Sequence, residues 1–230
     1  MKRLISVVLC VLLLMSVVFV GFTANADSNG GSNIVVVIDP GHGGIDGGSS
    51  NETYNVQERE LNLKIAQYFK AELETYDGID VYLTRNDNSD RSLGTGGDSL
   101  RKRAQIAADY GANLLVSVHC NSSTNKNVHG AEVYYSNDSS YEYMTHVWGG
   151  QIANAILSQL SNLGIYNRGA LTRTGTPTVD FPEIERYPDE SLADYYTIMI
   201  AARSHGITPL IAEHAFISNN SDYLNFLSTD

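Results

Sequence analysis

Short runs of apolar residues, many of them β-branched, recur along the chain and predict buried strands. Longer stretches between them carry apolar side chains at helical spacing and predict amphipathic helices. The strands are expected at 34–39, 79–84, 114–119, 131–136 and 208–213, and the helices at 58–76, 98–110, 142–163, 190–205 and 218–227.

This alternation of strands and helices predicts an α/β fold. We expect a three-layer sandwich, in which a mostly parallel central sheet of about six strands has helices on both faces. The stretch 167–188 holds three of the five prolines and shows no periodicity, so it is predicted to be a long surface loop. We find no internal repeat and no sign of a second domain.

The first 26 residues have the pattern of a secretory signal peptide. Lys2 and Arg3 precede an apolar run from 4 to 22, and Ala24-Asn25-Ala26 provides the small residues of a cleavage site. Because the apolar run is long enough to span a bilayer, the protein would contact the membrane if this segment were not removed. The expected organisation is a signal peptide at 1–26, a short polar leader at 27–33 and one folded domain at 34–230.

The expected mature chain is acidic. It carries 26 acidic residues against 13 lysines and arginines, a formal charge of −13. Such a surface argues against nucleic acid and anionic membranes as partners. Cys120 is its single cysteine, so an intrachain disulfide is excluded. A catalytic role for Cys120 is disfavoured, because its neighbour His119 should face the opposite side of a strand.

Two of the predicted strands end in histidines. The strand at 34–39 leads into a turn and then into His42, which has glycines on both sides, and the strand at 114–119 ends at His119. The carboxyl ends of parallel strands meet at one edge of a sheet, where ligands bind in α/β proteins. Glu58 begins the following helix and can reach the same edge. Two histidines and one glutamate form a catalytic ligand set for zinc, which leaves one position for water.

These residues also have simpler interpretations. A single histidine after a strand usually has a structural role, and a carboxylate such as Glu58 is favoured at any helix N-terminus. Glu52 and Glu60 are alternative carboxylate ligands. Asn121 can orient either His119 or a substrate. Three further histidines have no companions at ligand spacing and are expected at the surface, namely His129, His146 and His205.

Glu213 ends the apolar strand at 208–213 and should reach the same edge of the sheet. A carboxylate at the end of a buried strand needs a partner or a function. Glu213 is therefore the candidate general base, and the alternative is a salt bridge with an arginine such as Arg203. Asn62 lies one helical turn after Glu58 and can support that side chain without being a metal ligand itself.

Four short motifs follow one another along the chain. They are IDPGHGG at 38–44, ERELNL at 58–63, SVHCN at 117–121 and EHAFISN at 213–219. Their order and spacing resemble the zinc-dependent N-acetylmuramoyl-L-alanine amidases of the bacterial cell wall. The resemblance extends over roughly 34–225, nearly the whole expected mature chain.

The resemblance implies a zinc ion held by His42, Glu58 and His119, with Glu213 as the catalytic carboxylate. It implies hydrolysis of the amide between N-acetylmuramic acid and the L-alanine of the stem peptide in peptidoglycan. The domain at 34–230 would then be an amidase catalytic domain that acts in the bacterial envelope or outside the cell. The glycines around His42 would leave room for a bulky wall substrate.

Three features depart from the family's pattern. His214 stands where the family usually has a small residue, so it would either crowd the site or donate a hydrogen bond to substrate. Cys120 replaces the usual alanine, and the sequence ends soon after Leu227, where relatives tend to carry one more helix. Two other functions therefore stay open, a non-catalytic peptidoglycan-binding homologue and a zinc peptidase that cuts within the stem peptide. The sequence does not indicate the oligomeric state.

Overall fold

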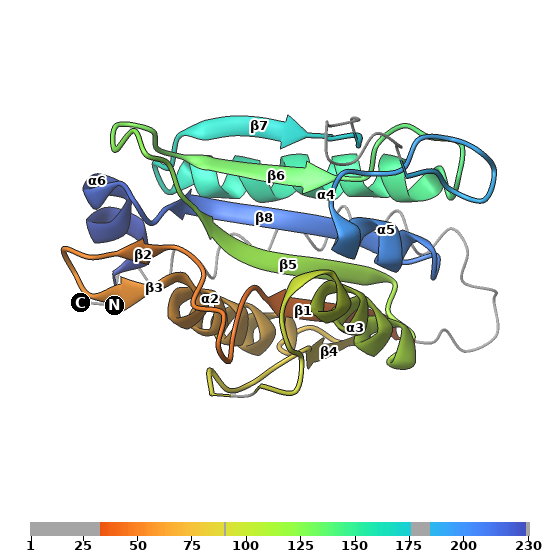
Figure 1. Cartoon of the computed structure of the whole chain (residues 1–230), viewed down its shortest axis with the longest axis horizontal. Helices are drawn as coiled ribbons and strands as arrows, with labels where there is room; N and C mark the ends of the chain where they lie inside the picture. Colours follow the sequence, from red (N-terminus) through yellow and green to blue (C-terminus); the bar gives the residue numbers. More distant parts are fainter. Residues whose placement is uncertain (1–32, 90, 176–184, 229–230) are drawn as a thin grey trace.

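The computed structural model describes residues 33–228, apart from residue 90 and residues 176–184. Six strands form one mixed sheet in the order β4-β1-β5-β8-β6-β7 (Figure 1). Four neighbours are parallel: β4 Ile79–Leu83, β1 Ile34–Pro40, β5 Leu114–Asn121 and β8 Thr208–Phe216. The other two run the opposite way, namely β6 Ala131–Tyr135 and β7 Asn167–Leu171. The predicted α/β fold with a mostly parallel sheet is confirmed.

Helices cover both faces of this sheet, because alternate residues of a strand point to opposite sides. Val36 and Ile38 of β1 pack in one apolar core, whereas Val37 between them packs in the other. The first core lies beneath α2 Glu58–Leu73 and α4 Met144–Asn162, and the second beneath α3 Gly96–Asp109 and α5 Thr197–Arg203. The sheet is therefore the middle layer of the sandwich that the sequence predicted.

Part of the loop predicted at 167–188 is a strand. β7 pairs in parallel with β6 at the edge of the sheet, with a register shift between Asn167 and Gly169. Because an edge strand is covered less completely than a central one, it needs no continuous apolar run, and the hydrophobic pattern did not reveal it. The prediction of a loop was wrong for these residues. Residues 176–184 of the same stretch lie outside the described part of the chain.

The helix predicted at 190–205 begins later, since α5 covers only Thr197–Arg203. Asp194 is buried and accepts hydrogen bonds from the main-chain N–H of Asn137 and from the hydroxyl of Tyr187, both at 2.7 Å. These long-range bonds fix the chain before α5 in an irregular course. The first half of the predicted helix was therefore wrong, because a local pattern does not register distant partners.

The two ends of the chain differ in how far the structure describes them. The predicted signal peptide and most of the leader lie within residues 1–32, outside the described residues. In the part that the structure describes, no helix has the length and apolar character needed to cross a membrane.

The C-terminal helix predicted at 218–227 is a short α6 followed by a π-helical turn, η2. An unpredicted hairpin precedes α2; the bounds of these elements are α6 Asn220–Asp222, η2 Tyr223–Leu227, β2 Ser50–Asn51 and β3 Val56–Gln57.

Candidate metal centre

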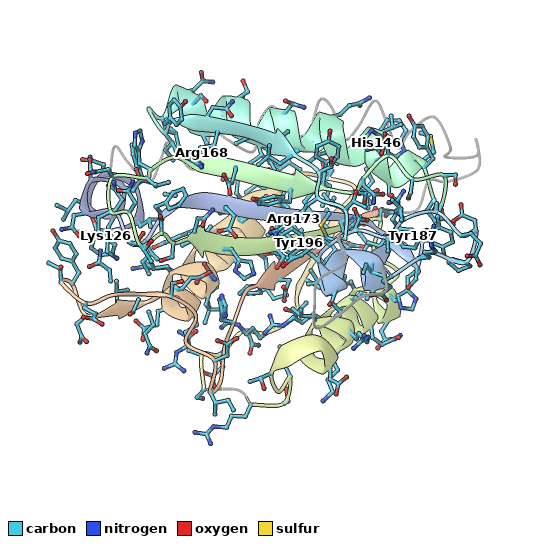
Figure 2. All side chains as sticks on the ribbon, turned by 45° about the horizontal axis from the view of Figure 1, so that its top comes forward. Lys126, His146, Arg168, Arg173, Tyr187 and Tyr196 are labelled. Atoms are coloured by element: carbon cyan, nitrogen blue, oxygen red, sulfur yellow. The ribbon has the colours of Figure 1, made fainter. Side chains whose placement is uncertain are left out.

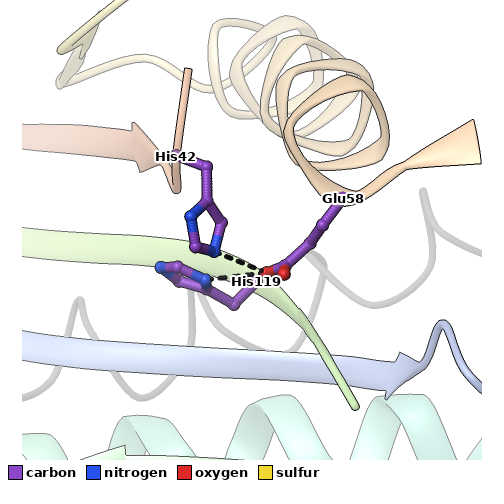
Figure 3. Close-up of side chains that lie close together, drawn as sticks. All are labelled: His42, Glu58 and His119. Carbon is purple, nitrogen blue, oxygen red and sulfur yellow. Dashed lines mark hydrogen bonds and ion pairs between the residues drawn. The ribbon is translucent and has the colours of Figure 1, made fainter. Parts of the chain in front are cut away.

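Three side chains from different elements converge at the carboxyl edge of the parallel strands (Figure 3). Nε2 of His42 lies 3.2 Å from Oε1 of Glu58, and Nδ1 of His119 lies 2.9 Å from the same oxygen. One ligand atom from each residue lies within 4.8 Å of the other two. These are the three residues that the sequence motifs singled out. The alternative carboxylates Glu52 and Glu60 are exposed and lie outside this group.

The backbone fixes where each of the three side chains begins. His42 follows β1 with a positive φ of 61°, a conformation that non-glycine residues seldom adopt. The preceding residue ties this turn to the neighbouring strand, because the N–H of Gly41 donates to the carbonyl of Val118 at 2.9 Å. His119 belongs to β5, and Glu58 is the first residue of α2. A strand end, a strand and a helix start therefore deliver one ligand each.

Hydrogen bonds orient the ligand side chains. Nδ1 of His42 lies 2.9 Å from Oδ2 of Asp46, as in metal sites where a carboxylate fixes the ring of the bound histidine. The main-chain N–H of Ser49 donates to Oε2 of Glu58 at 2.9 Å. Asn62 donates from Nδ2 to Oε1 of Glu58 at 3.3 Å, the contact expected from its spacing in the helix. Sequence reasoning missed Asp46, although its position four residues after His42 was a usable signal.

Two glycines make room for the ligands. A Cβ added at Gly41 would lie 2.2 Å from Cε1 of His119, and one at Gly48 would lie 2.6 Å from Cδ2 of His42. Both distances are far shorter than a carbon–carbon contact. The space beside Gly41 is filled by the protein's own side chain. The expectation that the glycines next to His42 clear room for a bulky substrate was therefore wrong at this position.

Two buried arginines hold the loop that carries His42. Arg103 donates to the carbonyls of Pro40 at 3.0 Å and of His42 at 2.7 Å. Arg85 donates to the carbonyls of Pro40 and Gly41, both at 2.9 Å. Three consecutive carbonyls are thus bound by charged donors, which form stronger hydrogen bonds than neutral ones. The sequence motif gave no sign of this clamp.

Arg103 is in turn paired with Asp39, which is 1% exposed. The two side chains meet at 2.6 Å, and Asp39 also accepts hydrogen bonds from the hydroxyls of Thr84 and Ser117. Burial alone would raise the pKa of Asp39, but the charge of Arg103 and these hydroxyls outweigh burial and lower it. The carboxylate therefore stays ionised and keeps Arg103 in place behind the His42 loop.

The electrostatics of the cluster suit a cation. Burial lowers the pKa of His42, but the carboxylates of Glu58 and Asp46 outweigh it and raise the pKa to about 9. Burial would raise the pKa of Glu58, yet hydrogen bonds from His119 and His42 outweigh it and hold the pKa below its usual range. A site whose negative charge draws a proton onto His42 also suits a divalent metal, whose binding would displace that proton. Two imidazoles and one carboxylate fit zinc.

Glu213 lies beside the cluster on the next strand, where it pairs with His119 in the register of β5 and β8. Its Oε2 is buried and has no hydrogen-bond partner among the described residues. Burial raises the pKa of Glu213 to about 7. A carboxyl group that titrates near neutrality is suited to accept and return a proton. The alternative salt bridge is not formed, because Arg203 pairs with Asp194 at 3.2 Å.

Two other residues from the motifs are not among the three ligands. Asn121 donates to Oε1 of Glu132 at 2.8 Å, so it contacts a carboxylate that sequence reasoning missed. The Nδ1 of His214 lies 3.0 Å and 3.4 Å from two main-chain carbonyls. His214 lies at a bulge of β8, where the register with β5 shifts between Glu213 and Phe216. His214 therefore contacts the main chain of the ligand His119, and its role beside the metal centre stays a prediction.

The remaining candidates have structural surroundings. Cys120 is buried, and burial raises the pKa of its thiol, which makes it a poor nucleophile. His129 and His205 are exposed, as expected. His146 is half-buried instead, and its Nδ1 lies 2.9 Å from the carbonyl of Ser136.

Comparison with known sequences connects this geometry to one family. Residues 36–230 match the family model described as N-acetylmuramoyl-L-alanine amidase. AmiA of Escherichia coli K12, an N-acetylmuramoyl-L-alanine amidase, is 38% identical over 112 residues, which are 47% of this chain and 34% of AmiA. The amidase LytC of Bacillus subtilis 168 is 28% identical over 188 residues, which are 81% of this chain and 30% of LytC. The chain spans about a third of the length of these two curated relatives.

A solved structure shares the fold. The N-acetylmuramoyl-L-alanine amidase from Clostridium difficile 630 superposes with a TM-score of 0.63 at 24% identity, over 86% of this chain and 87% of that chain. At this identity the likeness shows the fold, while the match over 36–230 shows the family. Two histidines and a glutamate meet at one edge of the sheet, beside a second glutamate whose buried Oε2 has no hydrogen-bond partner among the described residues. This arrangement agrees with both findings, and the chain belongs to the N-acetylmuramoyl-L-alanine amidase family.

Proposed function

We propose that this protein is a zinc-dependent N-acetylmuramoyl-L-alanine amidase that cleaves peptidoglycan. The observation that carries the proposal is the group formed by His42, Glu58 and His119, with the unpartnered carboxyl oxygen of Glu213 beside it. Membership of the family indicates which bond would be cleaved, namely the amide between N-acetylmuramic acid and the L-alanine of the stem peptide.

The residues divide the work between holding a metal and moving a proton. His42, Glu58 and His119 would hold the zinc ion, which when bound supplies a Lewis acid for the scissile carbonyl. Asp46 keeps Nδ1 of His42 engaged, so that Nε2 faces the other two ligands. Glu213 accepts a proton from the attacking water and returns it to the nitrogen of the leaving alanine. A pKa of about 7 suits both steps, because the group can be ionised first and protonated afterwards.

We also propose the organisation that the sequence indicates. Residues 1–26 would be a signal peptide, 27–33 a leader and 34–230 the catalytic domain, in a protein exported to the bacterial envelope. Two observations support this proposal, namely the small residues Ala24 and Ala26 after the apolar run and the match to the family model that starts at residue 36. Peptidoglycan lies outside the cytoplasmic membrane, so an enzyme that hydrolyses it has to be exported.

The proposal is tested with the protein lacking residues 1–26, reconstituted with zinc and incubated with purified muropeptides. We expect one zinc ion per chain and, by mass spectrometry, products with a free L-alanine amino terminus. His42→Ala should lose both zinc and turnover, whereas His129→Ala changes an exposed histidine and should keep both. Absence of zinc after reconstitution, or parental turnover in His42→Ala, would overturn the proposal.

Mass spectrometry of the same products also distinguishes the amidase from the two other possible functions. New termini within the stem peptide would identify a peptidase, and binding to sacculi without release of L-alanine amino termini would identify a binding protein. The structure gives the binding protein no particular support, because His214 occupies no ligand position; its Nδ1 lies against the main-chain carbonyls of Ala212 and His119.

A further inference from the structure

The face of the sheet that carries Glu213 continues beyond the metal centre. Ile211 and Tyr134 both pack in the core beneath α5, so they share one face. Glu213 lies two residues after Ile211 and therefore points to the same side. Glu132 lies opposite Glu213 in the register of β6 and β8, and Tyr134 lies two residues further along β6. A row of polar side chains thus extends from the metal centre along β6.

The row ends at an arginine held by aromatic rings. Arg173 is exposed, and its guanidinium carbon lies 3.6 Å from the ring centroid of Tyr195 and 5.9 Å from that of Tyr196. The ring of Tyr196 packs edge-on against Tyr134, with centroids 5.1 Å apart. Figure 2 shows Arg173 and Tyr196 together over the sheet. Such cation–π contacts hold the guanidinium in place and so reduce the entropy lost when it binds an anion.

Arg173 and Arg168 differ in whether a carboxylate of the protein is paired with their positive charge. The Nε of Arg168 donates to Oε2 of Glu132 at 2.7 Å, so a carboxylate of the protein already balances that cation. Among the described residues, no carboxylate forms an ion pair with Arg173. In a chain with a formal net charge of −11, this leaves a positioned cation on the catalytic face.

We propose that Arg173, held by Tyr195 and Tyr196, binds the α-carboxylate of the second residue of the stem peptide. This inference rests on the proposed function. The second residue is a glutamate joined through its γ-carboxyl group, so its α-carboxylate is free unless the wall amidates it. A guanidinium binds a carboxylate through two parallel N–H donors, a geometry that a carboxamide does not match. Arg173 would therefore select between non-amidated and amidated stems.

Two lengths agree with this assignment. From the scissile carbonyl to the second residue's α-carboxylate is two residues of extended peptide, about 7 Å. From Glu213 to Tyr134 is one strand spacing of about 4.8 Å across the sheet and two residues, about 7 Å, along β6, which is about 8 Å on the diagonal. A substrate with its scissile amide at Glu213 would bring the carboxylate over Tyr134, beside Tyr196 and Arg173.

The test compares two substrates that differ only in this charge. They are N-acetylmuramoyl-L-alanyl-D-glutamate and N-acetylmuramoyl-L-alanyl-D-isoglutamine, in which a carboxamide replaces the α-carboxylate. For the parent protein we expect kcat/KM to be about tenfold higher for the carboxylate, mainly through KM. Arg173→Gln should bring the two values together, and Arg173→Lys should keep part of the preference. Arg101→Gln removes an exposed charge on α3 and should leave the tenfold ratio unchanged.

A binding measurement keeps the inference separate from the proposed function. Calorimetry with the peptide L-alanyl-γ-D-glutamate and its amide needs no turnover. Tighter binding of the carboxylate by the parent protein, lost in Arg173→Gln, would support the assignment even if neither substrate were cleaved, and the amidase proposal alone would then fail. Equal binding of both peptides by the parent protein, or a preference that survives in Arg173→Gln, would overturn the assignment of Arg173.

Discussion

Glu58 and Glu213 lie at one edge of the sheet, but their surroundings are opposite. The carboxylate of Glu58 receives donors from the main chain and from Asn62, and both histidines face it. The buried Oε2 of Glu213 has no hydrogen-bond partner among the described residues. Hydrogen bonds thus outweigh burial at Glu58 and lower its pKa, while burial raises the pKa of Glu213 to about 7. The same side chain is suited to hold a cation in one place and a proton in the other.

The largest expected effect comes from replacing each of these glutamates by its amide. Glu58→Gln should lose zinc and, with it, turnover, because one anionic ligand is removed. Glu213→Gln should keep zinc and lower turnover by about 10²- to 10⁴-fold, because the group that carries the proton is lost. Metal analysis and steady-state kinetics on the same preparations distinguish the two. Retention of zinc by Glu58→Gln, or parental turnover by Glu213→Gln, would contradict the different roles given to the two glutamates.

Asp39 extends the comparison, since it is buried and fully partnered. Arg103→Met would leave its carboxylate without the paired cation, and we expect a loss of about 3–5 kcal/mol in the free energy of unfolding. Urea denaturation measures this loss. The double variant Asp39→Asn with Arg103→Met should recover part of it, because the unpaired charge is removed as well. A single variant as stable as the parent would show that Asp39 does not depend on Arg103.

A smaller effect is expected one layer behind Glu58. Asn62→Ala removes a donor to the ligand carboxylate without touching a ligand, and we expect about tenfold weaker zinc binding. Competition with a chelator of known affinity reports this directly. Asn154→Ala is the matched control, because this exposed asparagine bonds only to the main chain of its own helix α4 among the contacts described. Equal zinc affinity in the Asn62 variant and the control would show that Asn62 merely fills space.

The smallest effect should appear in acid. The pKa of Asp39 is lower in the folded protein than the value of about 3.9 of an unfolded chain. Its contribution to stability is therefore complete above about pH 4 and is lost as the pH falls through the folded-state pKa. In Arg103→Met, burial without the paired cation would raise that pKa and reverse the sign. Unfolding curves of both proteins between pH 7 and pH 3 test this, and parallel pH dependences would contradict it.

The sequence predicted the features that depend on local pattern. Apolar runs located the central strands, and the residues just after two of those runs, His42 and His119, lie together because the ends of parallel strands meet. Features that depend on distant partners did not show. Arg103 holds the His42 loop through main-chain carbonyls, which have no residue signature. Asp194 fits the periodicity of a helix, yet its bonds to Asn137 and Tyr187 keep the chain out of one.

The close packing of His119 against Gly41 has a consequence for the substitutions that position 41 tolerates. Any side chain there would overlap the ring of His119, whose Nδ1 lies 2.9 Å from Oε1 of Glu58. In a library that samples every amino acid at each position, Gly41 should accept no substitution with retained activity, whereas the exposed histidines His129 and His205 should accept many. One of the positions near the metal centre that tolerate substitution least would then be a residue without a side chain.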